Sequence, residues 1–112
     1  MFNKIIQDEI NINNIMQEYY TNLINKLPKG SIIVKNKENN KYLYLHYKEN
    51  DKTKNEYYGN YSKYDELLEL INRRNHYKEI LNKLKIELKK LERIGNIKWN
   101  YIMDQIKLLI SQ

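Results

Sequence analysis

Tyrosines and lysines alternate in the central part of the chain, and their types and spacing suggest binding chemistry. Seven of the eleven tyrosines lie between residues 41 and 64. On an open sheet face, aromatic rings can stack on unpaired bases while ammonium groups contact phosphates. The residues predicted to form such a face are Tyr42, Tyr44, Tyr58, Lys35, Lys48 and Lys54. The same pattern is typical of ordinary strand packing and of protein interfaces, so three interpretations stay open.

Catalytic chemistry is not indicated by the sequence. It contains no recognisable grouping of serine, histidine and acid, no glycine-rich phosphate loop and no pair of catalytic carboxylates. The two histidines, His46 and His76, have no further ligand at metal spacing, and a zinc site needs three or four ligands. We therefore predict a protein that is not an enzyme and that needs no metal and no cofactor.

Two adjacent arginines, Arg73 and Arg74, are further candidates for partner contacts. Arg74 falls on the apolar seam of a predicted helix, where a charged side chain costs stability unless it is paired. Either it contacts a partner or this part of the helix faces solvent, and the second interpretation is favoured.

The composition points to an anionic partner, but it has a second explanation. A net charge of +6 favours contact with nucleic acid or an acidic surface. However, most of the basic residues are lysine, and the abundance of Asn, Lys, Ile and Tyr is what A/T-rich codons produce. The absence of cysteine fits a reducing compartment, and no apolar run approaches the roughly 20 residues of a membrane helix. We expect a protein of the host-cell cytoplasm with no membrane partner.

Residues 1–28 are predicted to form one helix. Ile5, Ile12, Met16 and Tyr19 recur at helical spacing and would form its apolar face. Pro28 ends the helix, because the residue before a proline is pushed out of the helical region.

Residues 30–60 are predicted to form a three-stranded β-meander. Polar turns at 36–40 and 49–52 separate the strands, and turns this short make neighbouring strands antiparallel. Side chains alternate between the two faces of a strand. The face covered by a helix is assigned to Ile32, Val34, Leu43, Leu45 and Tyr57.

Residues 62–94 are predicted to form a long helix and residues 96–111 a shorter one. Gly95-Asn96 would end the long helix, and so short a connector makes the two helices antiparallel. A heptad seam is formed by Leu67, Leu70, Leu81, Leu84, Leu88 and Leu91. The same seam could join two copies of the chain in a homodimer.

These elements predict a single α+β domain over residues 1–112. It has an N-terminal helix, a three-stranded antiparallel β-meander, and then a long helix and a shorter helix that form an antiparallel coiled-coil hairpin.

Two sets of sequence segments resemble known proteins. They are Gly30-Ser31-Ile32-Ile33 with Lys41-Tyr42-Leu43-Tyr44-Leu45, and Lys54-Asn55-Glu56-Tyr57-Tyr58-Gly59 with the helix that follows. They resemble small phage-type proteins of mobile elements that have a Tyr-rich β-hairpin and a trailing coiled coil and that are anti-CRISPR-like in style. Residues 30–74 also resemble the arm-type DNA-binding domain of phage tyrosine recombinases. The second resemblance implies DNA binding and no recombinase activity.

Three functions are expected in turn. The first is a small non-enzymatic protein of a mobile element that inhibits a host nucleic-acid-guided defence complex by surface occlusion, with a host effector protein or nucleoprotein as its partner. The second is an accessory protein that binds DNA or RNA through the Tyr and Lys face. The third is a structural coiled-coil homodimer. Steep weakening of binding by salt would distinguish the second from the first.

Overall fold

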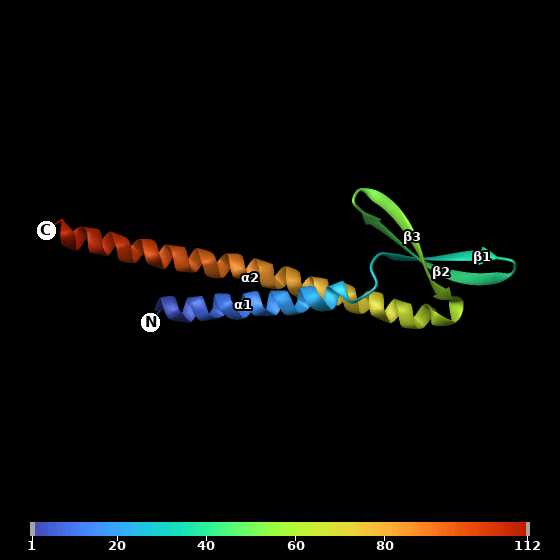
Figure 1. Cartoon of the computed structure of the whole chain (residues 1–112). Helices are drawn as coiled ribbons and strands as arrows, with labels where there is room; N and C mark the ends of the chain where they lie inside the picture. Colours follow the sequence, from blue (N-terminus) through green and yellow to red (C-terminus); the bar gives the residue numbers. More distant parts are fainter. Residues whose placement is uncertain (1, 112) are drawn as a thin grey trace. The chain divides into compact units, whose positions relative to one another are not determined.

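The computed structural model describes residues 2–111, and all of their side chains except those of residues 2 and 97–99. Helix α1 (Phe2–Asn25) is followed by the strands β1 (Ser31–Lys37), β2 (Asn40–Glu49) and β3 (Lys52–Asn60), as Figure 1 shows. A short 3₁₀ turn, η1 (Tyr61–Lys63), leads into helix α2 (Tyr64–Ile110). The α+β class, the N-terminal helix, the three-stranded antiparallel sheet and the long helix are confirmed.

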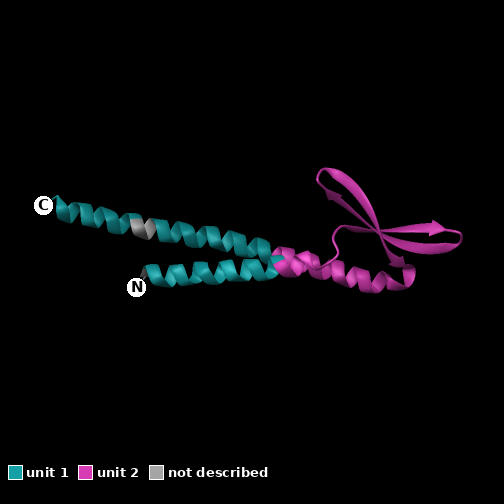
Figure 2. Cartoon of the chain, viewed as in Figure 1, with its two compact units in different colours: residues 1–21, 80–112 teal, residues 22–79 magenta. Residues whose placement is uncertain are grey.

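The chain divides into two compact units (Figure 2). The sheet unit, residues 22–79, holds the end of α1, the sheet and the first part of α2. The helical unit, residues 1–21 and 80–112, holds the rest of the two helices. Within the described residues, no helix is both long enough and apolar enough to cross a membrane.

The sheet is held by two tight hairpins in the order β1-β2-β3. The first turns at Glu38 and Asn39, whose φ angles are 51° and 68°, and the second at Asn50 and Asp51, with φ of 53° and 63°. Two successive positive φ angles define the type I′ turn, whose twist matches that of antiparallel strands. Asn and Asp tolerate this conformation better than other residues, which is why these polar segments turn the chain.

The core of the sheet unit lies between one face of the sheet and the start of α2. Leu43 and Leu67 are fully buried, and Leu45 and Ile71 are 6% and 9% exposed. The half-buried side chains that pack around this cluster are Ile32, Tyr47, Tyr58 and Tyr64. We call this side of the sheet the core face.

A β-bulge in β3 overturns part of the predicted face assignment. Leu43 pairs with Gly59 and Tyr44 pairs with Tyr57, so Tyr58 is the extra residue on β3. One extra residue reverses which side chains of a strand point to each face. Tyr57, predicted to be covered, is 56% exposed, while Tyr58 packs against the core. Val34, also predicted to be covered, is 40% exposed; it lies on the edge strand β1.

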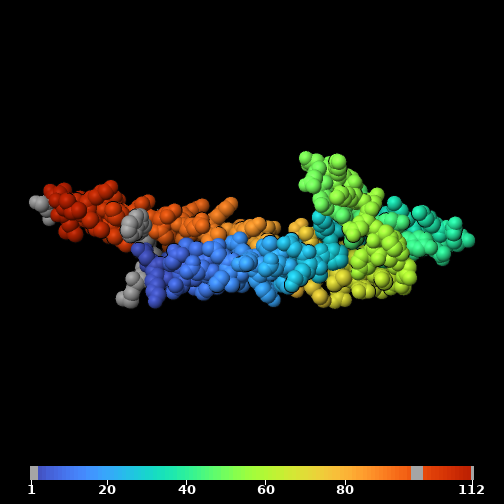
Figure 3. All heavy atoms as spheres, viewed as in Figure 1, coloured from blue at the N-terminus to red at the C-terminus, as the bar shows by residue number. Residues whose placement is uncertain are grey.

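The helical unit pairs the two helices in antiparallel orientation. The buried Asn13 donates a hydrogen bond from Nδ2 to the carbonyl oxygen of Leu84 (2.9 Å), and Ile6 lies beside Gly95. The N-terminal part of α1 therefore lies near Gly95 of α2, and the last turns of α2 extend beyond it (Figure 3).

The face of α1 that contacts α2 differs from the one predicted. The contacting stripe contains Ile6, Ile10, Asn13 and Gln17, and Gln17 donates from Nε2 to Oδ1 of Asn13 (2.7 Å). The predicted apolar stripe is exposed instead, with Ile5 62%, Ile12 50%, Met16 39% and Tyr19 59% accessible. Polar residues in the contacting stripe hid it from a search for apolar periodicity.

The predicted break at Gly95-Asn96 is corrected, because α2 continues through it as one helix of 47 residues. No antiparallel return of residues 96–111 forms; α1 takes that position on α2. A glycine within a helix costs only about 1 kcal/mol relative to alanine. That cost is smaller than the loss of hydrogen bonds that a break would bring.

Substitution of Gly95 by alanine is expected to stabilise the helical unit by up to about 1 kcal/mol. A Cβ atom at this position would lie 3.5 Å from Cγ2 of Ile6, an ordinary van der Waals contact. Thermal unfolding followed by far-UV circular dichroism measures the effect. A lower melting temperature for Gly95→Ala would instead indicate a turn at this residue, where alanine is strained.

Candidate functional site

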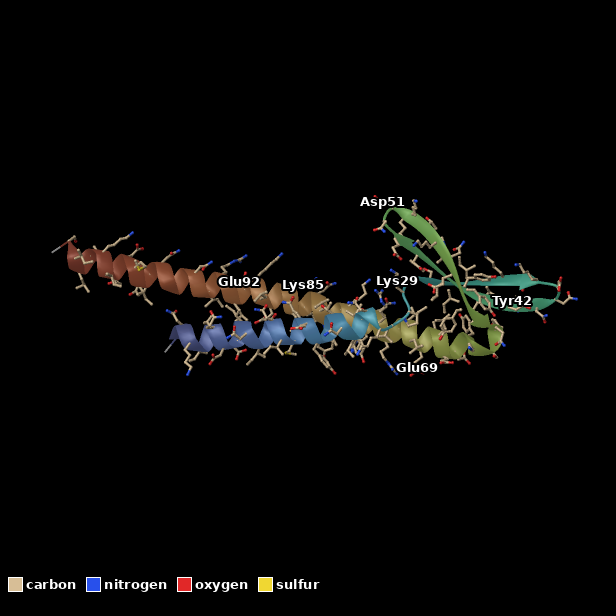
Figure 4. All side chains as sticks on the ribbon, in the orientation of Figure 1. Lys29, Tyr42, Asp51, Glu69, Lys85 and Glu92 are labelled. Atoms are coloured by element: carbon tan, nitrogen blue, oxygen red, sulfur yellow. The ribbon has the colours of Figure 1, made fainter. Side chains whose placement is uncertain are left out.

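Within the sheet unit the hydrophobic core lies on one face of the sheet, and we call the opposite face the open face. The strand register places on it Ser31, Ile33, Lys35, Lys37, Asn40, Tyr42, Tyr44, His46, Lys48, Thr53, Asn55, Tyr57 and Asn60. Figure 4 labels Tyr42 on this sheet. The face thus gathers side chains from all three strands.

Acidic strand residues are confined to one face of the sheet, whereas lysines lie on both faces, with Lys41, Lys52 and Lys54 on the core side. Among the strand residues of the open face, three are lysines, Lys35, Lys37 and Lys48, and none is acidic. The two acidic residues within the strands, Glu49 and Glu56, lie on the core side. The open face is therefore cationic, which favours an anionic partner.

Three tyrosines form a cluster on the open face. The ring of Tyr57 lies 5.5 Å from that of Tyr44, at 66°, and 6.3 Å from that of Tyr42. The Nζ atom of Lys35 lies 4.4 Å above the Tyr44 ring, within cation–π range. The cluster lines an open hollow of about 260 Å³ together with Lys37 and Glu38. Tyr57 is the most exposed of the three rings and is available for stacking.

His46 extends the open face toward the β2–β3 turn. Its Nδ1 atom lies 2.7 Å from Oδ1 of Asn55, the residue opposite it on β3. Because an amide oxygen can only accept, Nδ1 is the donor of this hydrogen bond. The described residues contain no group of three or more His, Cys, Asp or Glu side chains that could hold a metal ion.

Two residues predicted for the binding face lie on the core side instead. Tyr58 is moved there by the bulge, and Lys54 pairs with Tyr47 and places its Nζ 3.8 Å from Glu49. Sequence reasoning missed Tyr57 and Lys37. The lysine could have been found by continuing the alternation of β1 by one step, whereas Tyr57 and Tyr58 carry the same side chain and cannot be told apart by pattern.

The two arginines are engaged within the sheet unit and do not lie on the open face. Arg73 donates to Glu69 one helical turn away (3.1 Å). Arg74 donates from Nε to the carbonyl oxygen of Ile24 (3.3 Å), at the C-terminal end of α1. The same carbonyl also accepts from the backbone N–H of Leu27 (3.1 Å), and a cation at the C-terminal end of a helix interacts favourably with the helix dipole. The contact with Ile24 therefore explains the charge of Arg74 on the seam, and no partner protein is needed to explain it.

The seam leucines are also used within the chain. Leu67 is fully buried in the core of the sheet unit, and Leu70 is half-buried. The remaining four, Leu81, Leu84, Leu88 and Leu91, are half-buried on the side of α2 that α1 covers. The homodimer seam predicted from the heptads is thus occupied by the chain's own elements.

On the core side, Tyr47 borders a groove of about 440 Å³ next to the end of α1. Its hydroxyl donates to Oε2 of Glu56 (3.1 Å), and Nζ of Lys29 lies 4.7 Å from the ring centre. The hydrogen bond to Glu56 raises the pKa of Tyr47, and desolvation and the charges of Glu56 and Glu49 raise this pKa further.

The raised pKa of Tyr47 predicts how the free energy of unfolding depends on pH. The folded chain keeps this proton at a pH where the unfolded chain loses it. The stabilisation is therefore complete below pH about 10 and is lost as the pH rises through the folded-state pKa. We expect the free energy of unfolding to fall less steeply above that pH in Tyr47→Phe than in the wild type. Urea titrations at a series of alkaline pH values measure this, and equal slopes would contradict it.

Comparison with known proteins places the chain in a family. Residues 6–69, more than half of the chain, match the family model described as a domain of unknown function (DUF6788). The match spans most of α1, the whole sheet and the start of α2. No curated protein and no solved structure matches the chain. The chain belongs to the DUF6788 family.

Proposed function

We propose that this protein binds single-stranded nucleic acid through the open face and is not an enzyme. The observation that carries the proposal is the absence of acidic strand residues from the open face, where three lysines accompany a cluster of three tyrosines. Unpaired bases offer planar rings for tyrosine, and the backbone offers phosphates for lysine.

Each group on the open face has a distinct role in this proposal. Tyr57 is the most accessible ring and would stack on a base, while the rings of Tyr44 and Tyr42 pack against it and hold it in place. Lys35 would keep its cation–π contact and still reach a phosphate, because an ammonium group has three donors. Lys37 and Lys48 would contact phosphates on either side of the tyrosine cluster.

The salt dependence of binding tests the role of the lysines. Each phosphate contact on a single strand contributes about 0.7 to the slope of log K against log salt concentration. We expect Lys48→Gln to lower that slope by about this amount and to weaken binding to a mixed-sequence oligonucleotide. The matched control is Lys52→Gln, which is also exposed but faces the core side opposite Glu49. Equal effects of the two substitutions would contradict the proposal.

Surface occlusion of a host nucleic-acid-guided complex, the first function expected from the sequence, stays a prediction. The tyrosine cluster favours it to the extent that tyrosines packed edge to face are rigid anchors in protein interfaces. Capture of host partners with and without nuclease treatment separates the two functions. Capture that survives nuclease would favour occlusion, and capture that is lost would favour nucleic-acid binding.

A further inference from the structure

The helical unit leaves most of its apolar side chains exposed. All five buried hydrophobic residues of the described chain lie in the sheet unit, and the buried residue of the helical unit is the polar Asn13. Two helices can cover only one stripe of each other. Exposed apolar surface on this scale marks an interaction site.

Several of the exposed apolar residues lie on one side of the α1–α2 pair, although Ile15 and Ile86 do not. A hollow of about 140 Å³ on this side is lined by Glu9, Ile12, Asn13, Met16, Leu84, Glu87 and Leu91. Residues at spacings of three, four and seven from Glu9 and Glu87 lie on the same side of their helices, so the surface around this hollow continues along both helices. We call this surface the helical flank; it comprises Ile5, Glu9, Ile12, Met16 and Tyr19 of α1 and Lys83, Glu87, Lys90, Ile94 and Tyr101 of α2.

The last turns of α2 add a second apolar surface next to the flank. Ile102 and Leu109 continue the heptad stripe of Leu84, Leu88 and Leu91, but they belong to the last turns of α2, the red segment that extends past the N-terminal end of α1 in Figure 3. They are 37% and 72% exposed, and Leu108 and Ile110 are 59% and 79% exposed. In contrast, Asp104 and Lys107 form a polar stripe on the opposite side. This segment needs a neighbour that α1 does not supply.

The two helices of this unit carry opposite charge. Residues 2–21 of α1 contain one lysine against three acidic residues, whereas residues 80–110 of α2 contain seven basic residues against three acidic ones. On the helical flank itself the same difference is smaller: α1 contributes Glu9 and no basic residue, and α2 contributes Lys83 and Lys90 against Glu87. A surface of this kind matches itself when a twofold axis brings the negative helix of each copy onto the positive helix of the other.

We propose that a second copy of this chain covers the helical flank in a twofold-symmetric four-helix bundle. The twofold axis runs parallel to the helices, so that α1 of each copy lies on α2 of the other in antiparallel orientation. Both C-terminal ends of α2 then lie at the same end of the bundle and pack against each other. This dimer does not use the leucine seam predicted from the sequence, which stays covered by the chain's own α1.

Sedimentation of the full chain over a dilution series tests the interface. We expect a dimer that dissociates on dilution, and at least tenfold weaker dimerisation in Ile12→Glu. Asn11→Glu is the matched control, since it places the same charge at an exposed neighbouring position that lies off the flank. Circular dichroism of both variants confirms that the helices form. A wild type that is monomeric at every concentration, or equal weakening by both substitutions, would overturn the proposal.

Cysteine cross-linking tests the direction of the axis, and the chain has no native cysteine to interfere. Under oxidising conditions, Leu109→Cys should give a disulfide-linked dimer, because the two α2 ends are adjacent. Asp104→Cys, on the polar stripe, should give little. If the Leu109→Cys protein sediments as a dimer but does not cross-link faster than Asp104→Cys, the parallel arrangement of the α2 ends is incorrect.

Discussion

Leu67→Ala is expected to lower the free energy of unfolding of the sheet unit by about 2–5 kcal/mol. Leu67 is fully buried against Leu43, which is itself fully buried on β2. Removal of its side chain therefore loses the transfer free energy of the deleted atoms and also leaves a cavity. The core of this unit is small, so a loss of this size is a large fraction of its stability.

Urea unfolding followed by near-UV circular dichroism is the appropriate measurement, because Tyr47, Tyr58 and Tyr64 pack against this cluster. Leu68→Ala is the control, since the adjacent Leu68 is 38% exposed and the chemical change is identical. We expect it to cost less than about 1 kcal/mol. If the two variants lost equal stability, or if the loss at Leu67 depended on protein concentration, Leu67 would not be a core residue of one chain.

Tyr57→Ala is expected to weaken binding of single-stranded nucleic acid about tenfold or more. Stacking of one base on an aromatic ring contributes about 1–3 kcal/mol, and about 1.4 kcal/mol corresponds to a factor of ten. Tyr57 is 56% exposed, so its truncation exposes little of the core. Loss of its ring contacts with Tyr42 and Tyr44 should lower the free energy of unfolding by about 1 kcal/mol.

The control for Tyr57→Ala is Tyr61→Ala. Tyr61 is 45% exposed, stacks on Tyr64 at 5.5 Å and has Nζ of Lys41 5.1 Å from its ring centre, but it follows the sheet in η1. The two substitutions thus remove similar aromatic contacts. Fluorescence anisotropy with a labelled oligonucleotide measures both affinities. A weaker effect at Tyr57 than at Tyr61 would exclude Tyr57 as the stacking residue.

The order of elements could be read from the sequence because local signals are strong. The turns at 38–39 and 50–51 are polar and contain residues that tolerate positive φ, and the strands between them alternate. Leu43 and Leu45 were correctly assigned to the core, since β2 is the central strand and has no irregularity on its β1 side.

Features that depend on tertiary context could not be read in this way. The bulge depends on the pairing of β2 with β3, and Tyr57 and Tyr58 are identical in sequence terms. The stripe of α1 that faces α2 contains Asn13, whose Nδ2 donates to the carbonyl oxygen of Leu84, 71 residues away. At Gly95 the local signal for a helix end was overridden, because α1 packs across that position.

Residue-by-residue NMR chemical shifts, recorded as a mixed-sequence single-stranded oligonucleotide is added, test the central claim most directly. We expect the largest amide perturbations on the open face, around Tyr44, Tyr57 and Lys48. Leu67 and Ile71, in the helix on the core face, should change little. Perturbations concentrated on the core face or on the helical unit, or no perturbation at low salt, would contradict binding of nucleic acid by the open face.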